Sequence, residues 1–392
     1  MQKHFPALAS GFSFLDNAAG AQVPQACIDG ITQFLSNASC NVGMPYAGSQ
    51  LSTQTREQTR LETAQFLNCQ PDEVVIGPSA TALTFRLSGA FARIFKPGDE
   101  IVISELEHEC NASPWRDLER IGCVVKVWKA HFPEGRLALT DLEPLLSART
   151  RLLAITSAAN SLGNTPDVAG AVRLAHAVGA WVVNDQVHAS PHHLPDVAAS
   201  GVDFAFFSAY KVFSTHLGFM YVRRALLEQL PAQKLHFLPE HSLLKFEPGT
   251  NNFEAMAGWL GTLGYLRSEL GAGLAGRAGL VAAYKRIQAL EQPLLEYALE
   301  RFKALPNAIL YGEPTAHGRV GTLSFNLRGA DPLEVATYLG QHGVGVAAGH
   351  CYATMPMQAL GLMPNGAIRA SIAHYSTTAD IDKLFEALEQ KD

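Results

Sequence analysis

The chain has 392 residues, with 30 Lys and Arg against 36 Asp and Glu, which gives a formal net charge of −6. This acidic balance argues against electrostatic capture of nucleic acid as the main function. Apolar residues make up 47% of the chain and charged residues 17%, enough core-forming material for two domains. We therefore expect a compact, soluble, two-domain protein and not a disordered chain.

The N-terminal sequence and the spacing of the cysteines indicate in which cellular compartment the protein is expected. No stretch reaches the roughly 18 uninterrupted apolar residues of a membrane span, and residues 1–12 lack the long apolar core of a signal peptide. The cysteines form neither CxxC pairs nor a regular spacing, so neither a disulfide framework nor a thiolate zinc site is expected. They are Cys27, Cys40, Cys69, Cys110, Cys123 and Cys351. These features favour a cytoplasmic protein without membrane association.

From residue 74 onward, short apolar runs alternate with helical patterns. The predicted strands are residues 74–77, 100–104, 124–128, 151–157, 181–185, 203–208 and 218–222. Helices are predicted to begin at Ser79 and after Cys110, and another covers residues 168–178. This alternation predicts an α/β fold with a mostly parallel sheet and helices on both faces. Because ligands bind at the carboxyl ends of such strands, we expect the site in the loops after Gly77, Asp185 and Ser208.

Beyond Leu266 the pattern changes to that of a smaller α+β domain. The sequence predicts, in order, a long helix, two strands, a helix, a strand and a terminal helix. The first five cover residues 271–304, 308–311, 322–327, 332–342 and 367–376. We place a large domain at residues 15–265 and a small domain at residues 1–14 and 266–392. No linker is long enough to let them move independently, so the two domains should pack firmly together.

Residues 77–81, Gly-Pro-Ser-Ala-Thr, are the first candidate for chemistry. They directly follow a predicted strand and open a helix. Free backbone N–H groups and the helix dipole at such a position favour a phosphate group. The alternative is that Ser79 is only the N-cap of this helix.

Two single residues complete a pattern with this phosphate cradle. Asp185 ends the apolar strand WVVND, where a buried carboxylate needs a cation or a strong donor; a salt bridge to a neighbouring loop is the alternative. Lys211 follows an apolar run, where desolvation favours a neutral amine able to form a Schiff base, unless its stem reaches the surface. Phosphate cradle, buried acid and strand-end lysine together match the requirements of pyridoxal phosphate.

The chain resembles the cysteine desulfurase and selenocysteine lyase-like family, in the class V branch of fold-type I pyridoxal-phosphate enzymes. Nine segments in the family's order carry this resemblance: FLDNAAGAQVP at 14–24, GPSATALTF at 77–85, EHECNASPW at 107–115, AANSLGN at 158–164, NDQVHASPHH at 184–193, SAYK at 208–211, FEPGTNNFE at 246–254, GHCYA at 349–353 and IRASIAHYS at 368–376. The resemblance implies a seven-stranded, mostly parallel sheet in the large, cofactor-binding domain. It also implies pyridoxal 5′-phosphate as cofactor and a homodimer with shared sites.

Roles carry over by position. The resemblance implies that Lys211 binds the cofactor covalently and removes the substrate's Cα proton, that Asp185 pairs with the pyridine nitrogen, and that His108 stacks on the ring. Arg369 would clamp the substrate carboxylate, with His350 nearby. Further cofactor contacts are implied for Ser79, Ala80, Thr81, Asn160, His188, Ser208, Tyr210 and, toward the partner subunit, Thr250.

The sequence departs from the family pattern at positions that are expected to determine the substrate and the reaction. His188 replaces a glutamine that many desulfurases carry, and VFSTHLG follows the lysine where the family has a Phe-Gly-Pro. Ala347 and Ala348 replace an arginine, which removes one of two expected carboxylate contacts. The family order Gly-His-His-Cys becomes Gly-His-Cys-Tyr, so Cys351 lies one position early. Cys351 is a candidate persulfide-forming residue; the alternative is a small residue that lines the pocket or packs beneath it.

The expected function is that of a cysteine desulfurase-like C–S lyase acting on a small, sulfur-bearing amino acid. Elimination from Cβ would give pyruvate and ammonia, whereas attack by Cys351 on the sulfur would give alanine and a persulfide; no sulfur-acceptor protein is identified. The alternatives are an epimerase, an aminotransferase, or an idle scaffold, which Lys211 and Asp185 argue against. Metal binding by His188, His192 and His193 is disfavoured because the cofactor already uses Asp185. The run at 343–349 lacks the context of a dinucleotide fingerprint.

Overall fold

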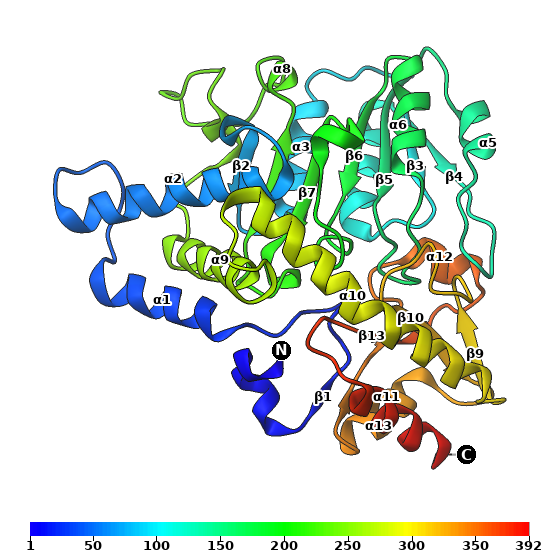
Figure 1. Cartoon of the computed structure of the whole chain (residues 1–392). Coiled ribbons are helices and arrows are strands. Elements are labelled where there is room, and N and C mark those ends of the chain that lie inside the picture. Colours follow the sequence, from blue (N-terminus) through cyan, green and yellow to red (C-terminus); the bar gives the residue numbers. More distant parts are fainter. Residues whose placement is uncertain (392) are drawn as a thin grey trace.

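The computed structural model describes residues 1–391, which form a large α/β part and a smaller α+β part (Figure 1). The large part is built on a seven-stranded sheet in the order β2-β8-β7-β6-β5-β3-β4. Its strands are β2 (Val74–Gly77), β3 (Glu100–Ser104), β4 (Val124–Trp128), β5 (Thr150–Thr156), β6 (Trp181–Asp185), β7 (Phe204–Ser208) and β8 (Gly218–Val222). Only β8 runs antiparallel to its neighbours β2 and β7. The predicted fold class and strand number are confirmed.

Helices cover both faces of this sheet. Side chains alternate along a strand, so β2 directs Val74 and Ile76 to one core and Val75 to the other. The first core packs against α1, α2, α6 and α9, and the second against α3, α4 and α8. The helices of this part are α1 (Gln25–Asn37), α2 (Ala47–Leu67), α3 (Ala80–Phe91), α4 (Ser113–Arg116), α5 (Leu139–Leu142), α6 (Val168–Ala177), α7 (Val197–Ser200), α8 (Arg224–Leu227) and α9 (Phe253–Tyr265).

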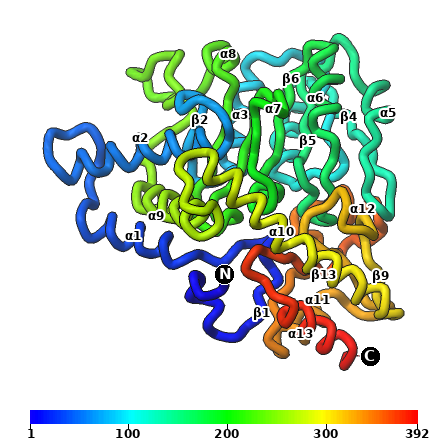
Figure 2. The backbone as a smooth tube through the Cα atoms, in the orientation of Figure 1, coloured from blue at the N-terminus to red at the C-terminus, as the bar shows by residue number. Residues whose placement is uncertain are grey.

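The C-terminal part contains a four-stranded antiparallel sheet in the order β12-β13-β10-β9. Its elements are α10 (Gly276–Lys303), β9 (Ala308–Tyr311), β10 (Thr322–Leu327), α11 (Pro332–Gln341), β12 (Ala347–Gly349), α12 (Thr354–Ala359), β13 (Ala367–Ser371) and α13 (Thr378–Glu389). The N-terminal strand β1 (Ser13–Phe14) pairs in parallel with β11 (Val344–Gly345). The blue N-terminal segment therefore lies beside the orange and red C-terminal part, and α10 connects the two parts (Figure 2).

Short turns of other helix types link these elements. Nine are present in the described residues: η1 (Gln2–His4), η2 (Pro6–Ser10), η3 (Pro71–Glu73), η4 (Glu109–Asn111), η5 (Asp117–Ile121), η6 (Glu143–Leu145), η7 (Ala209–Lys211), η8 (Leu243–Phe246) and the π-helical turn η9 (Leu266–Leu270). Within the described chain, no helix combines the length and the apolar character that a bilayer span requires.

Three predicted boundaries differ from the structure by more than two residues. The helix expected after Cys110 is only the four residues of α4, followed by η5, which ends at Gly122 with φ +89°. The long C-terminal helix begins at Gly276, not at residue 271, because η9 and a glycine-rich turn precede it. β13 ends at Ser371, whose carbonyl accepts a hydrogen bond from the Asn17 side chain, so the strand does not continue to residue 376.

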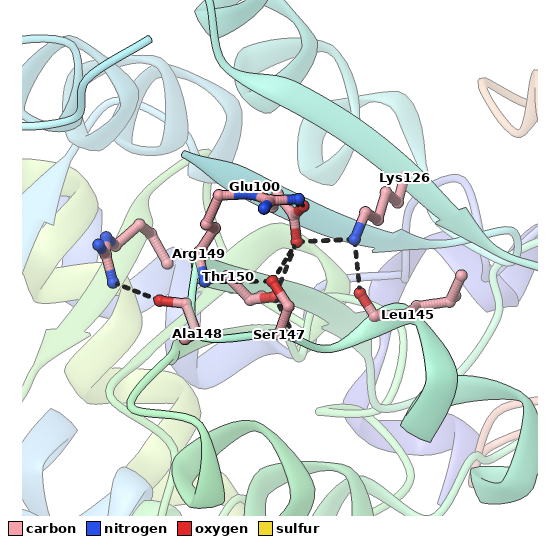
Figure 3. Close-up of polar contacts among 8 residues, drawn as sticks. Glu100, Lys126, Leu145, Ser147, Ala148, Arg149 and Thr150 are labelled. Carbon is pink, nitrogen blue, oxygen red and sulfur yellow. Dashed lines mark hydrogen bonds and ion pairs between the residues drawn. The ribbon is translucent and has the colours of Figure 1, made fainter. Parts of the chain in front are cut away.

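The buried carboxylate of Glu100 connects the amino end of β3 to the segments beside it. Glu100, the first residue of β3, accepts hydrogen bonds from Lys126 (2.6 Å), Ser147 (2.7 Å) and Arg149 (2.6 Å) (Figure 3). Burial alone would raise the pKa of Glu100, but these donors outweigh it and lower the pKa to about 2. The network lies at the amino end of β3 and joins it to β4 and to the loop before β5. This network lies at the end of the sheet opposite to the carboxyl ends of the strands, where a ligand-binding site is expected.

Candidate active site

A cavity of about 580 Å³ opens where β5, β6 and β7 end, beneath β12 and β13 of the C-terminal sheet. Its wall combines segments that are far apart in the sequence. The predicted site residues that line it are Ala80, Thr81, His108, Asn160, Asp185, His188, Ser208, Tyr210, Lys211, Cys351 and Arg369. The structure thus brings eleven of the fourteen predicted residues into one wall.

The other three predicted residues lie outside this wall. The Ser79 hydroxyl caps α3 by accepting a hydrogen bond from the Ala82 backbone N–H at 3.1 Å. His350 accepts a hydrogen bond through Nδ1 from the backbone N–H of Tyr352 at 3.1 Å. Thr250 is exposed and lines a neighbouring cavity of about 640 Å³. The exposed Phe85 lines both cavities, so the two are adjacent.

One end of the cavity has the features of an anion cradle. Thr81 lies in the first turn of α3 and Ser208 ends β7, and both line the cavity. β8 lies between β2 and β7, with Gly218 paired to both Gly77 and Ser208. A Cβ on Gly218 would collide with the backbone of Ser79, so the turn into α3 requires glycine there. Hydroxyl groups and the free N–H groups of a helix N-terminus fit a phosphate.

Lys211 lies in η7, directly after β7, with its amine inside the cavity wall. Its Nζ donates hydrogen bonds to the backbone carbonyls of Ala18 and, at 2.8 Å, Ala19. Burial lowers the pKa of Lys211 to about 7, and the positive charge of Arg369 adds to this effect. A large fraction of Lys211 is therefore a neutral amine near neutral pH, the form that attacks a carbonyl carbon.

Asp185 ends β6 as a buried carboxylate without a cation. Its Oδ1 accepts a hydrogen bond from the Val187 N–H at 2.8 Å, and the Cys110 thiol donates to Oδ2 at 3.5 Å. Among residues 1–391, no Lys, Arg or His nitrogen forms an ion pair with it. Burial raises its pKa to about 6, against the lowering effect of these two donors. A carboxylate of this kind fits the protonated nitrogen of a pyridine ring.

His108 and Glu107 precede η4. Glu107 is fully buried, and it accepts hydrogen bonds from Ser104, from the Thr156 N–H (2.7 Å) and from Asn111 (2.6 Å), which ties this loop to β3 and β5. Burial raises its pKa to about 8 in spite of these donors. Burial, followed by the charges of Lys211 and Arg369, lowers the pKa of His108 to about 4. His108 is therefore a neutral, flat ring in the cavity wall at neutral pH.

Arg369 and Asn160 carry buried polar atoms that the protein does not satisfy. Arg369 donates to the Asn160 carbonyl at 3.1 Å and lies 3.5 Å from the Asp16 carboxylate, but its Nε has no partner within the described chain. The side-chain oxygen of Asn160 likewise has none there. Buried polar atoms are nearly always satisfied, so two such atoms on residues of one cavity wall indicate a polar ligand there.

The segment around Cys351 is fastened to the cavity wall. Asn160 donates to the Cys351 carbonyl and the Glu109 N–H donates to the Tyr352 carbonyl, each at 2.8 Å. Cys351 and Tyr352 both have left-handed backbone, with φ +49° and +55°, which costs of order 1 kcal/mol or more per residue. Gly366 allows the segment to approach, since a Cβ there would collide with the backbone of Gly349. Burial raises the pKa of the Cys351 thiol, which lines the cavity.

Sequence reasoning missed several contributors to this wall. The Ala18 and Ala19 carbonyls hold Lys211, and Cys110 donates to Asp185. Ala18 and Ala19 belong to the segment at 14–24 and Cys110 to the segment at 107–115, so membership in those segments was the available signal. Their roles depend on contacts across more than 70 residues of chain, which periodicity does not show.

Comparisons with known proteins identify the family of this chain. The family model described as aminotransferase class-V matches residues 13–384. The chain is 34% identical to a cysteine desulfurase of Klebsiella pneumoniae, with 96% of this chain and 92% of that protein covered. It is 33% identical to a cysteine desulfurase of Serratia proteamaculans, with 100% and 97% covered.

Solved structures give the same result. The apo structure of a cysteine desulfurase from Thermococcus onnurineus NA1 has a TM-score of 0.88 at 25% identity, with 100% of this chain and 96% of that chain covered. A cysteine desulfurase from Escherichia coli has a TM-score of 0.84 at 26% identity, with 99% and 96% covered. These similarities confirm the predicted family resemblance and support its enzyme class, a cysteine desulfurase-like lyase. The chain belongs to the aminotransferase class-V family.

Proposed function

We propose that this chain is a pyridoxal-phosphate enzyme that cleaves the C–S bond of a small, sulfur-bearing amino acid. The family is dependent on pyridoxal phosphate in general. The observation that carries the proposal is the placement of Lys211 and Asp185 in one cavity, each with a pKa shifted toward neutrality by burial. The cysteine desulfurase relatives, at 33–34% identity over nearly the full length, support the choice of substrate class.

The residues present fit this cofactor. Thr81 and Ser208 would bind its phosphate, with Ala80 at the same helix N-terminus. Asp185 would pair with the ring nitrogen, and Lys211 would hold the cofactor covalently. His108 would stack on the ring; Tyr210, Asn160 and His188 complete the wall around it. When bound, pyridoxal phosphate supplies an electron sink for the substrate's Cα.

The protein's own groups then have separate tasks. Arg369 would bind the substrate carboxylate through its guanidinium, whose Nε has no partner in the described chain. Lys211, released from the cofactor, would take the proton from Cα, a transfer suited to an amine with a pKa of about 7. Asp185, in its buried position, would keep the ring nitrogen protonated by its negative charge. No carboxylate contact comes from Ala347 or Ala348, so Arg369 carries this task among the aligned positions.

The fate of sulfur depends on Cys351. Its thiol is in the wall of the cavity, so attack on a substrate sulfur is geometrically open to it. Burial raises its pKa, however, and the loop is fastened by backbone hydrogen bonds. Both features disfavour a mobile thiolate. We therefore propose elimination from Cβ, in which the C–S bond breaks and the sulfur leaves as hydrogen sulfide or a thiol. Hydrolysis of the remaining fragment by one water molecule gives pyruvate and ammonia, and no protein nucleophile is required.

The test is a screen of amino acids by cofactor spectrum, followed by product analysis. Purified protein reconstituted with pyridoxal phosphate should show a visible band that shifts with its substrate, and pyruvate, ammonia and a sulfur product should form from it. The Lys211→Ala variant is the control: it should lack the band of the covalently held cofactor and show no turnover. Racemised substrate or an oxo acid with retained sulfur would identify an epimerase or an aminotransferase and would contradict the proposal.

We also propose a cytoplasmic homodimer in which Thr250 serves the partner's site, with domain limits at 15–265 and 1–14 plus 266–392. The homodimer is supported by an exposed surface at Thr250, where Phe85, a large apolar side chain, is 49% exposed. The cytoplasm is supported by the six free cysteines, which suit a reducing compartment. Mixing Lys211→Ala with Thr250→Ala protomers tests the shared site. Recovery of activity in the mixture supports it, because one site of each mixed dimer then carries neither substitution. A mixture as inactive as its components contradicts it.

A further inference from the structure

His188, in the loop after β6, is held by the C-terminal sheet. Its Nε2 lies 2.9 Å from the hydroxyl oxygen of Thr322, the first residue of β10. Both side chains are buried, and His188 lines the cavity. Thr322 pairs with Ser371 of β13, the strand that also carries Arg369. One pair of strands therefore supplies both the candidate substrate clamp and the partner of this histidine.

The direction of this hydrogen bond follows from the surroundings of Thr322. Within residues 1–391, its hydroxyl makes no other hydrogen bond. A buried O–H without an acceptor costs about 1–3 kcal/mol, so the hydroxyl hydrogen points to Nε2 of His188. Nε2 is then the acceptor, and a neutral imidazole carries its single hydrogen on Nδ1.

The groups around His188 keep it neutral. Burial is the main cause that lowers its pKa well below the ordinary value, followed by electrostatic repulsion from His192, Arg369, Lys211 and His108 whenever these groups are protonated. The His192 ring packs against it at 5.9 Å between centroids, with 72° between the planes. His192 is itself held by Glu291 of α10, 2.7 Å from its Nδ1. Asp185, three residues earlier, is the nearest acid in the sequence.

Asn160, in the same cavity wall, can offer a ligand only part of the hydrogen bonding that the ligand needs. Its amide nitrogen donates to the Cys351 carbonyl at 2.8 Å, so its buried oxygen is the atom left without a partner. That amide nitrogen has a single further N–H to offer, whereas a ligand oxygen accepts two hydrogen bonds, so a second donor is needed beside Asn160. Nδ1–H of His188 is the group that Thr322 makes available.

We propose that Thr322 is a positioning residue that fixes His188 as a hydrogen-bond donor toward the ring hydroxyl of bound pyridoxal phosphate. This inference rests on the proposed function, because it presumes that cofactor. Thr322 touches neither substrate nor cofactor and acts only through His188. It extends the cofactor site to the C-terminal sheet, outside the nine segments that carry the family resemblance.

The test is a pH titration of the visible cofactor band, together with the dissociation constant of the cofactor, in Thr322→Val and Thr322→Ser. Valine keeps the shape and removes the hydroxyl. Without the donor, the ring oxygen holds its proton more tightly, so we expect the midpoint to rise by about one pH unit and the cofactor to bind about tenfold more weakly. Serine restores the hydroxyl and should return both values to those of the wild type. Thr59→Val is the matched control, since Thr59 is equally buried and its hydroxyl has no partner in the described chain.

Unchanged values in Thr322→Val, or equal losses in the valine and serine variants, would overturn the inference. If the valine variant does not fold, nitrogen NMR of histidine-labelled wild-type holoenzyme decides, with His188→Gln for assignment. An unprotonated Nε2 supports the inference and a protonated Nε2 overturns it. Failure of the wild type to form a visible band would instead count against the proposed function, so the two failures are distinguishable.

Discussion

Asp185→Asn should make the cofactor-free protein more stable and the loaded enzyme far slower. Burial raises the pKa of Asp185 from 3.8 to about 6 in the folded protein. In the unfolded chain the carboxyl ionises near its ordinary value, so between about pH 4 and 6 the unfolded state loses its proton first. Stability therefore falls as pH rises through this window. Each pKa unit of this shift corresponds to about 1.36 kcal/mol, so at neutral pH the charged Asp185 lowers the free energy of unfolding by about 3 kcal/mol.

Asparagine has almost the same shape as aspartate but carries no charge, so the variant avoids the free-energy cost of burying the Asp185 carboxylate. We expect urea unfolding of the cofactor-free variant at neutral pH to give a free energy of unfolding higher than that of the wild type by about 2–3 kcal/mol. The difference should vanish below about pH 3, where Asp185 is protonated in both states. Turnover with cofactor should fall by about 10²–10³-fold, because the neutral amide cannot hold the ring nitrogen protonated.

Asp203→Asn is the matched control. Asp203 is also buried near the central sheet, but it is paired with His176 at 2.9 Å and Arg223 at 3.2 Å. Removing its charge leaves the Arg223 cation without its acid, so stability should fall by about 1–3 kcal/mol. If Asp185→Asn is less stable than the wild type at neutral pH, the Asp185 carboxylate is not an unpaired charge and the reasoning is refuted. Near-normal turnover would show that Asp185 is only structural.

Three further outcomes follow from the same site. The rate at which pyridoxal phosphate attaches to the cofactor-free protein should rise with pH to a plateau, with a midpoint near the pKa of about 7 of Lys211; a midpoint near 10.5 would contradict the effect of burial. Arg369→Lys should raise KM for the amino acid about tenfold through loss of the planar fork, while the exposed Arg328→Lys leaves it unchanged. Cys351→Ala should retain a substantial part of the activity with pyruvate as product; complete loss, with alanine as the wild-type product, would restore a persulfide mechanism.

Much of the fold is predictable because the core of the large part is made of short, separate apolar runs. Polar residues, glycine or proline lie within two positions of each end of the strands at 74–77 and 181–185. The alternation of such strands with helices predicts a parallel sheet. Asp185 and Lys211 could be singled out because a charged residue that ends an apolar strand, or follows it within a few residues, lies near a ligand-binding edge. The end of β13 could not be found, since an Asn17 side chain from the other end of the chain stops it.

The site is less predictable than the fold, since its details depend on tertiary contacts. Ser79 has two readings in the sequence, and its hydroxyl caps α3 in the structure. Cys351 is offset in its motif, yet it lines the cavity, on a segment whose backbone is left-handed at Cys351 and Tyr352. Thr322 is 134 residues from His188, and no local pattern connects them.

The central claim is that Lys211 is the covalent anchor of the cofactor, and borohydride reduction with peptide mapping tests it most directly. Reduction of the reconstituted wild type should fix pyridoxal phosphate on the peptide that contains Lys211, at one equivalent per chain. Lys211→Ala should remain folded and unlabelled, because other groups in the wall supply the remaining grip on the phosphate and ring. Lys245, a buried lysine bonded to three backbone carbonyls, is an internal control and should stay unlabelled. Label on any lysine other than Lys211, or undiminished label in Lys211→Ala, would contradict the account.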